Sequence, residues 1–475
     1  MYNFLRQKKG RKIFVVGLDC AEPSLVFDRW RDDLPNLRQL MTGGAYGPLT
    51  SSIPCITVPA WTSMTSSKDP GVLGCYGFRN RADYSYDNMT IATGAVVQEP
   101  RVWELLGQAD KQVILVGVPQ TYPVKPVNGT LVSDFLTPTV QRQYTHPNEF
   151  RYEIDRLLGG REYDVDVHQF RTEDKDFLLK QIYEMTEKHF IVLNHLLKNK
   201  PWDFFMFVEM GIDRIHHGLW KYMDPAHLKH EPGNRYQDAI KDYYRYVDQE
   251  LGALLSALDD DTVVLVVSDH GAQRMDGGIC INEWLRREGY LVLKEEPVRV
   301  DNKLIPFEKV EVDWGKTTAW GAGGYYARIF LNVRGREPQG LVSQADYEHV
   351  RDQLASDIEA LPDHQGRPLK NSCFRPEAIY REVRNFPPDL IVYLGGLHWR
   401  AVGSFGFDSV YTFENDIGPD DANHAQDGLI IYYDPRQNLH GKRLSGSGLM
   451  DFAPTVLHLM GQPAPEDMQG RIIQP

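Results

Sequence analysis

Long runs of hydrophobic residues, each followed by an acidic residue, mark the chain at three places. Residues 12–19 read KIFVVGLD, residues 202–210 read WDFFMFVEM, and residues 262–269 read TVVLVVSD. Such β-branched and aromatic runs are typical of strands buried on both faces of a parallel sheet. Because the carboxyl ends of parallel strands meet at one edge of a sheet, we expect Asp19 and Asp269 to lie close together.

Segments with helical spacing alternate with these runs. The pattern predicts helices at residues 34–44, 234–258, 344–361 and 451–460, a helix-rich segment at 148–200, and a helix followed by a strand in residues 102–121. Alternating strands and helices are typical of an α/β fold. We therefore expect a mostly parallel central sheet with helices on both faces and right-handed crossovers.

The length of the chain favours more than one hydrophobic core. Its 475 residues exceed the roughly 250–300 residues at which a single core stops growing. The stretch 294–312 is charged and contains two prolines, which marks the edge of an inserted segment. We expect a catalytic domain formed by residues 1–288 and 387–475, and an inserted α+β lobe, residues 289–386, that overhangs the site.

Imidazole and carboxylate side chains follow two of the hydrophobic runs. His270 comes directly after Asp269 and before Gly271, a residue that permits a sharp turn. We interpret Asp269 and His270 as metal ligands, and Asp19 as a ligand at the same edge. The alternative for each aspartate is a cap on the following helix, which is a common use of such residues.

Two further positions add ligands to this edge. Asp213 and His217 are four residues apart, so on a helix they lie on one face and can bind a single ion. His216 would point about 100° away and is the weaker candidate. His424 precedes a hydrophobic segment and can reach the same edge of the sheet. The alternative is that His424 is exposed to solvent and has no functional role, as is more common for an isolated loop histidine.

Thr57 is the candidate nucleophile. It lies between Pro54 and Pro59, and a helix over residues 59–66 can begin at Pro59. A hydroxyl at a helix N-terminus faces unpaired amides and the positive end of the helix dipole, which suits a nucleophile and an incoming phosphate. Five nearby hydroxyls are rivals on spacing alone: Ser51, Ser52, Thr62, Ser63 and Thr65.

Charge and cysteine content restrict the partners of the chain. The net charge is −13 and no long basic stripe occurs, so a nucleic-acid-binding surface is disfavoured. An anionic substrate would then need local positive charge, most readily from bound divalent cations.

The five cysteines are scattered and never form CxxC, which predicts free thiols and a cytoplasmic location. Residues 1–19 fit neither a signal peptide nor a membrane span.

Six motifs occur in an order that resembles the alkaline phosphatase superfamily: GLD, PCITVPAW, GIDRIHH, SDHG, NHAQDG and DFAPTVLHLMGQPAPEDMQGR. Within it, the chain is most similar to the type I phosphodiesterase/nucleotide pyrophosphatase branch and its cytoplasmic relatives described as phosphohydrolases or phosphomutases. The resemblance covers about residues 12–471. It implies a three-layer alkaline phosphatase-like sandwich and a small-molecule phosphate ester as substrate.

The resemblance also implies two divalent metal ions, Zn²⁺ in the first place and Mn²⁺ as the alternative. Seven positions carry the expected residue type: Asp213, His217 and His424 for one ion, and Asp19, Asp269, His270 and the Thr57 oxygen for the other. It further implies phosphoryl-ester hydrolysis, as a phosphodiesterase or a phosphatase, through a phospho-threonine at Thr57. It places Arg79 and Asn80 near the family's phosphate-binding position.

The chain departs from the family at two positions. Cys20 stands where glycine often follows the first aspartate, and Leu73 stands where a histidine often follows the nucleophile helix. Neither is a ligand position, so we expect altered surroundings rather than lost activity. Five aromatic residues are candidates to face a second substituent of the substrate: Trp61, Trp220, Trp320, Tyr325 and Trp399.

Three other functions remain as alternatives. A phosphomutase would use the same metals and phospho-enzyme but return the phosphoryl group to a second hydroxyl. A sulfatase is disfavoured because Ile56 stands where its nucleophile motif requires arginine. A non-catalytic metal-binding protein is the third alternative. No feature of the sequence indicates the oligomeric state.

Overall fold

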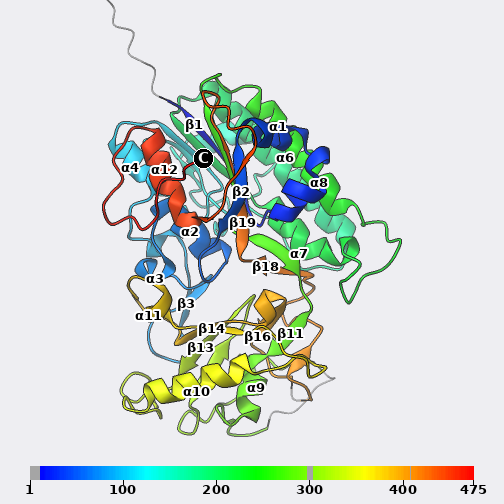
Figure 1. Ribbon diagram of the computed structural model, residues 1–475, viewed down its shortest axis with the longest axis vertical. Coiled ribbons are helices and arrows are strands. Elements are labelled where there is room, and N and C mark those ends of the chain that lie inside the picture. The colour runs from blue at the N-terminus through cyan, green and yellow to red at the C-terminus, as the bar shows by residue number, and fades with distance from the viewer. Residues whose placement is uncertain (1–10, 297–302, 407) are drawn as a thin grey trace, which may run out of the picture.

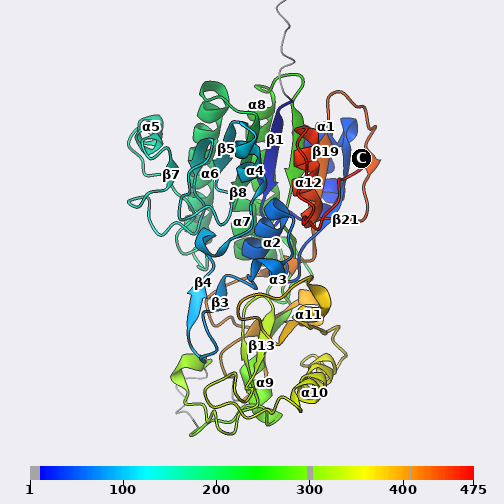
Figure 2. The same cartoon turned by 90° about the vertical axis from the view of Figure 1, so that its left-hand side faces the viewer.

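The computed structural model describes residues 11–296, 303–406 and 408–475, which form two stacked parts (Figure 1). The larger part holds a wide sheet between helices, and a smaller lobe lies beyond one end of that sheet. Figure 2 shows the same division from the side, with β3 (Arg79–Arg81) and β4 (Met89–Ile91) at the junction. Residues 1–10, on which part of the targeting prediction rests, lie outside the described residues.

The central sheet joins ten strands of the described residues. Its middle consists of parallel neighbours in the order β9 (Val263–Val267), β1 (Ile13–Leu18), β8 (Phe204–Glu209), β5 (Val113–Val116) and β6 (Gly129–Val132). The edges are completed by β19 (Asp427–Tyr433), β2 (Ala45–Thr50), β20 (Lys442–Arg443) and β21 (Ser447–Gly448) beyond β9, and by β7 (Thr145–His146) beyond β6. The three hydrophobic runs are therefore adjacent strands, and the mostly parallel sheet is confirmed.

Helices cover both faces of this sheet, as Figure 1 shows. One face carries α1 (Pro35–Gly43), α6 (Lys175–Asn199), α7 (Gly211–Met223) and α8 (Ala239–Leu255). The other carries α2 (Thr57–Ser66), α4 (Val102–Gln108) and α12 (Phe452–Leu459), with α3 (Pro70–Leu73) next to α2. The short helix α5 (Phe150–Leu157) precedes α6. The expected three-layer arrangement is thus confirmed.

The lobe has its own sheets and its own core. An antiparallel sheet runs β12 (Ala319–Ala322), β13 (Ala327–Leu331), β15 (Leu390–Tyr393), β14 (Ser372–Phe374), and a second sheet runs β16 (Trp399–Val402), β11 (Gly277–Cys280), β17 (Tyr411–Thr412). Helices α9 (Ile281–Arg287), α10 (Tyr347–Glu359) and α11 (Pro376–Ile379) pack around them. This core extends from Ile279 to Phe405, beyond both ends of the expected 289–386 segment. The domain boundaries themselves stay a prediction.

The helix that carries Thr57 begins earlier than the proline pattern predicts. Pro59 was expected at the first helical position, but α2 begins at Thr57 and Pro59 is its third residue. Proline is tolerated there because the first amides of a helix have no acceptor within the helix. The shift makes Thr57 the first helical residue, so its hydroxyl projects from the N-terminus itself.

Gly17 brings α2 close to the central strand β1. A Cβ atom at this position would lie 2.7 Å from the ring of Trp61 and 2.8 Å from both the Phe207 carbonyl oxygen and the Val208 side chain. Only hydrogen fits in that space. The indole of Trp61 can therefore lie over the strand and donate a 2.7 Å hydrogen bond to Asp19. Packing of the core thus positions a residue of the predicted site.

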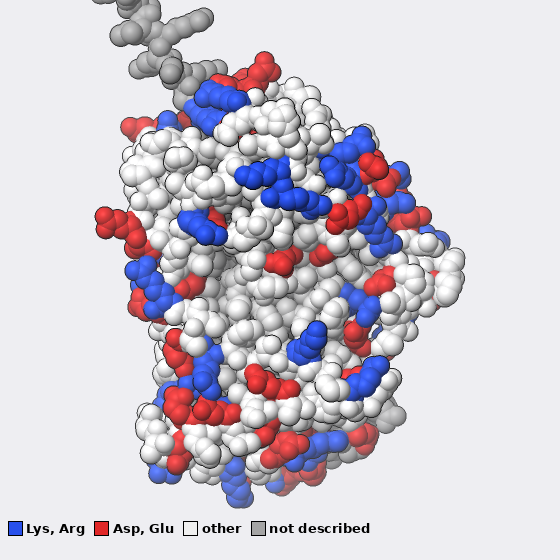
Figure 3. All heavy atoms as spheres, in the orientation of Figure 1, with Lys and Arg blue, Asp and Glu red and all other residues white. Residues whose placement is uncertain are grey.

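The outer surface carries charges of both signs. On the face shown in Figure 3, Lys and Arg side chains are interspersed with Asp and Glu over both parts of the molecule. Among the described residues, no helix combines the length and the apolar character that crossing a membrane requires.

Replacing Gly17 with alanine should destabilise the fold. Overpacking of this kind costs about 1–3 kcal/mol, because Trp61 or the strand must move, and urea unfolding measures the loss. Gly315→Ala is the matched control, since its Cβ would meet only Asp313 at 3.5 Å, an ordinary contact. Equal stability of the two variants would contradict the packing argument.

Candidate metal centre

The six predicted ligand side chains converge at the carboxyl ends of the central strands. Asp19 follows β1, Asp269 and His270 follow β9, and Asp213 and His217 lie in the first two turns of α7, directly after β8. His424 lies in β18 (Ala422–Ala425), which pairs with β10 (Gly271–Arg274). All six side chains are buried. The parallel order of β1, β8 and β9 thus gathers five of these residues, and the antiparallel pair β10–β18 brings His424 to them from more than four hundred positions beyond Asp19.

One group contains Asp213, His217 and His424. The Asp213 Oδ1 atom lies 3.2 Å from His217 Nε2 and 3.9 Å from His424 Nε2, and the two Nε2 atoms are 3.3 Å apart. As predicted, the spacing of four on α7 places Asp213 and His217 on one face. His216 points elsewhere, with its Nε2 atom 3.3 Å from the Tyr244 hydroxyl.

The second group contains Asp19, Asp269 and His270. His270 Nε2 lies 3.1 Å from Asp269 Oδ2 and 4.0 Å from Asp19 Oδ1. The Thr57 hydroxyl is 3.4 Å from the same nitrogen. The rings of His270 and His424 stack with centroids 3.8 Å apart, which joins the two groups into one centre.

Each imidazole is held by its other nitrogen. The Nδ1 atom of His217 lies 2.8 Å from Asp420 Oδ1, that of His424 lies 2.9 Å from the Cys55 carbonyl, and that of His270 lies 3.1 Å from the Gly271 carbonyl. Since these partners are acceptors, neutral rings donate from Nδ1 and present the lone pair of Nε2 to the centre. Metal-binding histidines are oriented in this way.

Each carboxylate is likewise held by one oxygen only. Trp61 donates to Asp19 Oδ2, Arg214 donates to Asp213 Oδ2, and the Cys20 amide donates to Asp269 Oδ1 at 3.2 Å. The remaining oxygens, Oδ1 of Asp19, Oδ1 of Asp213 and Oδ2 of Asp269, are buried without a hydrogen-bond partner.

The residues present therefore fit a metal centre. Three unpartnered carboxylate oxygens face three imidazole Nε2 atoms, and burying so many unpartnered carboxylate oxygens is costly unless a cation lies among them. Oxygen and imidazole nitrogen are donors that suit divalent transition metals. The side chains form two sets of candidate ligands, one with Asp213, His217 and His424 and one with Asp19, Asp269 and His270.

The pKa values of the ligand side chains reflect the close approach of several carboxylates in the centre. Burial, together with the nearby Asp213 carboxylate, raises the pKa of Asp19 well above its ordinary value, and burial with Asp19 does the same for Asp269. Burial lowers the pKa of His270 to about 4. Burial opposes a charged His217, but Asp420 and Asp213 outweigh it and raise its pKa to about 9. The centre thus attracts positive charge at the His217 side.

A family model for type I phosphodiesterase/nucleotide pyrophosphatase matches residues 13–420. The chain belongs to this family. It is accordingly an enzyme that hydrolyses phosphoric ester bonds. Five of the six ligand residues lie inside the matched segment, and His424 follows four residues after it. No curated protein matches the chain.

Solved structures confirm the alkaline phosphatase-like fold of this phosphodiesterase family member. Phosphonoacetate hydrolase from Sinorhizobium meliloti, in complex with phosphonoformate, has a TM-score of 0.59 at 14% identity. An inactive threonine-to-alanine variant of murine ectonucleotide pyrophosphatase/phosphodiesterase 5, in complex with AMP, has a TM-score of 0.54 at 12% identity, and the human protein 0.52 at 13%. Each likeness covers 96% of both chains.

The structure adds residues to the centre that the sequence pattern did not identify as its parts. Asp420 holds His217, and the Tyr325 hydroxyl donates to Asp420 at 2.9 Å. The Tyr325 ring lies 4.8 Å from the His217 ring and 4.4 Å from the His424 ring, measured between centroids. Arg171 donates to both Asp420 and Tyr325. In the sequence, Tyr325 was one of the five aromatic candidates and Asp420 lies four residues before His424, but Arg171 had no signal.

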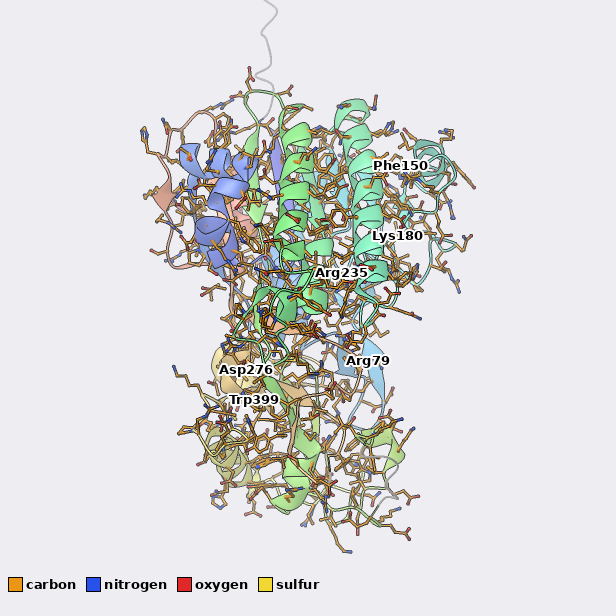
Figure 4. All side chains as sticks on the ribbon, turned by 90° about the vertical axis from the view of Figure 1, so that its right-hand side faces the viewer. Arg79, Phe150, Lys180, Arg235, Asp276 and Trp399 are labelled. Carbon is orange, nitrogen blue, oxygen red and sulfur yellow. The ribbon has the colours of Figure 1, made fainter. Side chains whose placement is uncertain are left out.

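Of the five aromatic candidates, two contact the centre. Trp61 is bonded to Asp19, and Tyr325 covers two of the histidines. Trp220 packs on His216, while Trp320 and Trp399 belong to the core of the lobe. Figure 4 labels Trp399 within that lobe.

The predicted phosphate-binding pair lies on β3. Arg79 is exposed, and Figure 4 shows it at the level where the two parts meet. The Asn80 side chain accepts from the Tyr76 amide at 2.7 Å and donates to the Gly77 carbonyl at 2.9 Å, which closes its own turn. Within residues 11–296, 303–406 and 408–475, neither side chain bonds to Thr57 or to a ligand residue. Their substrate role stays a prediction without support from this geometry.

Asp420→Asn should weaken metal binding, since the substitution removes the charge that makes His217 a stronger donor. Replacing such supporting carboxylates typically costs about 10–100-fold in metal affinity. Titration of the metal-free protein with Zn²⁺ measures the change. Asp421→Asn is the matched control, because its side chain faces Lys221 at 3.7 Å instead of a histidine. Equal affinities for both variants would contradict the role of Asp420.

Proposed function

We propose that the protein hydrolyses phosphoric diesters with two divalent cations and with Thr57 as the nucleophile. The observation that carries this proposal is the position of the Thr57 hydroxyl. It projects from the first residue of α2, 3.4 Å from His270 Nε2, beside three carboxylates that each have an unpartnered buried oxygen. A helix N-terminus favours the negative charge of an alkoxide and of a phosphate.

The donor set supports one ion in each ligand group. Asp213, His217 and His424 would hold one, and Asp19, Asp269, His270 and the Thr57 oxygen the other. Such ions, when bound, would lower the pKa of the Thr57 hydroxyl and neutralise charge on the phosphoryl oxygens. Three carboxylates with three imidazoles favour Zn²⁺, and Mn²⁺ is the alternative that metal analysis distinguishes.

The reaction then has two displacements at phosphorus. The Thr57 oxygen forms a bond to phosphorus in line with the leaving ester oxygen, whose bond breaks, and the alcohol leaves with a proton. A water molecule then attacks the phospho-threonine, which releases a phosphate monoester and restores the hydroxyl. Thr57 is buried at the helix N-terminus, with 3% of its surface exposed, which limits the access of bulk water to its hydroxyl.

Two of the similar proteins support this assignment. The inactive murine variant has an alanine in place of a threonine and is in complex with a nucleotide, AMP. The bacterial relative is named for hydrolysis of a phosphonate and holds phosphonoformate. Both ligands are small anions, as the proposal requires of the substrate here. A cytoplasmic location stays a prediction, and the five free cysteines suit a reducing compartment.

Thr57→Ala should abolish turnover of a bis-aryl phosphate while both ions stay largely in place, because three protein ligands remain for each. Loss of a nucleophile lowers kcat by more than about a thousandfold, and a spectrophotometric assay of the released phenol follows it. Thr65→Ala is the matched control: its buried hydroxyl donates to the Trp61 carbonyl at 2.8 Å, two turns along the same helix. Activity retained in Thr57→Ala would refute the nucleophile assignment.

A comparison of three substrates should identify the reaction class. We expect a bis-aryl phosphate and a nucleotide aryl ester to be cleaved faster than an aryl monophosphate, with a monoester and an alcohol as products. Preference for the monophosphate would indicate a phosphatase. Transfer of the phosphoryl group within a sugar phosphate, without release of phosphate, would indicate a phosphomutase.

A further inference from the structure

Cys20 lies between the two ligand groups. It directly follows Asp19 at the end of β1, and its side chain is fully buried. Its sulfur belongs to the first group: one donor atom from each of Cys20, Asp213, His217 and His424 lies within 4.8 Å of the others. The sulfur therefore faces the centre, whereas the other four cysteines are in neither ligand group.

The surroundings of Cys20 are fixed by the same residues that build the centre. Its amide donates to Asp269 Oδ1 at 3.2 Å, and its thiol donates to the Gly271 carbonyl at 3.4 Å. Asp269 and Gly271 flank His270. The position of the sulfur relative to the ligands is thus fixed by a contact to the Asp269 side chain and a contact to the Gly271 main chain. Because a thiol is a weak hydrogen-bond donor, its bond to the carbonyl is weak.

A second observation points to a ligand at this place. The Oδ1 atom of Asp213 is buried without a hydrogen-bond partner, and the His217 and His424 Nε2 atoms lie 3.2 Å and 3.9 Å from it. An unpaired carboxylate oxygen, two imidazole nitrogens and a sulfur form four donors around one point. Zinc binds nitrogen and sulfur at about 2.0–2.3 Å in tetrahedral geometry, so small movements would bring all four to one ion.

We propose that the Cys20 sulfur is a fourth ligand of the ion held by Asp213, His217 and His424. The inference rests on the metal centre of the proposed function and deepens it. When the ion binds, the thiol loses its proton to solvent and the sulfur binds as a thiolate. No electron is transferred and no oxidant is needed.

The sulfur changes which metal this position prefers. Thiolate is a soft donor that favours Zn²⁺ and Cd²⁺, whereas carboxylates alone also suit Mn²⁺ and Mg²⁺. The other group, with Asp19, Asp269 and the Thr57 oxygen, has no sulfur and keeps a harder character. A fourth protein ligand also fills the tetrahedral position that a substrate oxygen would take, so substrate must enter as a fifth donor. The centre would then hold two unequal ions.

Cobalt substitution of the full-length protein tests the proposal, because Co²⁺ bound to a thiolate absorbs in the near ultraviolet through sulfur-to-metal charge transfer. The metal-free wild-type chain loaded with two equivalents of Co²⁺ should show this band. Cys20→Ser and Cys20→Gly should lose it while still binding cobalt. Glycine adopts without strain the backbone φ of +63° found at Cys20, so this variant keeps the fold.

Cys75→Ser is the matched control. The Cys75 thiol is also buried and also donates to a carbonyl, that of Gly77 at 3.7 Å, but it is in neither ligand group. This variant should keep the charge-transfer band. Competition between Zn²⁺ and Mn²⁺ gives a second readout. In Cys20→Gly, the ratio of Zn²⁺ affinity to Mn²⁺ affinity should fall by at least about tenfold, which is the smaller of the losses typical when residues around a metal are replaced.

The outcomes separate this inference from the proposed function. Two bound cobalt ions without a sulfur band, or a band that persists in Cys20→Gly, would overturn the role of Cys20 and leave the metal centre intact. Absence of metal binding would overturn both. A Thr57→Ala variant that stays active would refute only the assignment of Thr57 as the nucleophile. The sulfur-to-cobalt charge-transfer band would still test whether Cys20 binds the metal.

Discussion

The burial of three carboxylates beside three imidazoles is the constraint on which the rest of this molecule depends. Bringing Asp19, Asp213 and Asp269 together out of water is strongly unfavourable unless positive charge lies among them. Arg214 supplies one such charge, which it shares between Asp213 and Asp166. It cannot neutralise three carboxylates. The architecture therefore holds the ligands rigidly enough that a cation can complete the balance, and the strands, helices and lobe all contribute to that rigidity.

Each part of the fold holds one side of the centre. The glycine at position 17 of β1 lets α2 approach closely enough for Trp61 to bind Asp19. The lobe supplies Tyr325, whose ring stacks on His217 and lies tilted against His424. It also supplies Tyr393, whose hydroxyl accepts from the Cys55 amide at 2.9 Å, two residues before Thr57. Cys55 in turn accepts from His424. Because the lobe supports both the loop before Thr57 and two of the histidines, it contributes to the candidate metal centre and is more than a cover over it.

Much of this arrangement was predictable from the sequence, for local reasons. Buried strands have continuous hydrophobic runs, and their order brings Asp19 and Asp269 to one edge; the spacing of four predicts the pairing of Asp213 with His217. What was not predictable depends on contacts between distant segments. The lobe core reaches from Ile279 to Phe405 because β11 pairs with β16, more than a hundred residues away. The roles of Tyr325 and Asp420 depend on side-chain directions that no periodic pattern encodes.

The two ligand groups differ in their donor atoms and charge, and this difference suits them to different roles in the proposed reaction. The group around His217 has two imidazoles, a carboxylate already paired with Arg214, and the supporting charge of Asp420. The group around His270 has two carboxylates whose unpartnered oxygens face the His270 imidazole without an arginine or lysine bonded to them, and it is this group that the Thr57 hydroxyl approaches. In the proposed mechanism, a cation held by these two carboxylates would stabilise the alkoxide of Thr57, so this harder set of donors suits an oxygen nucleophile. In the proposed reaction, an ion held by the group around His217 would balance the charge on the leaving oxygen, so the asymmetry of the donors would match the asymmetry of an in-line displacement.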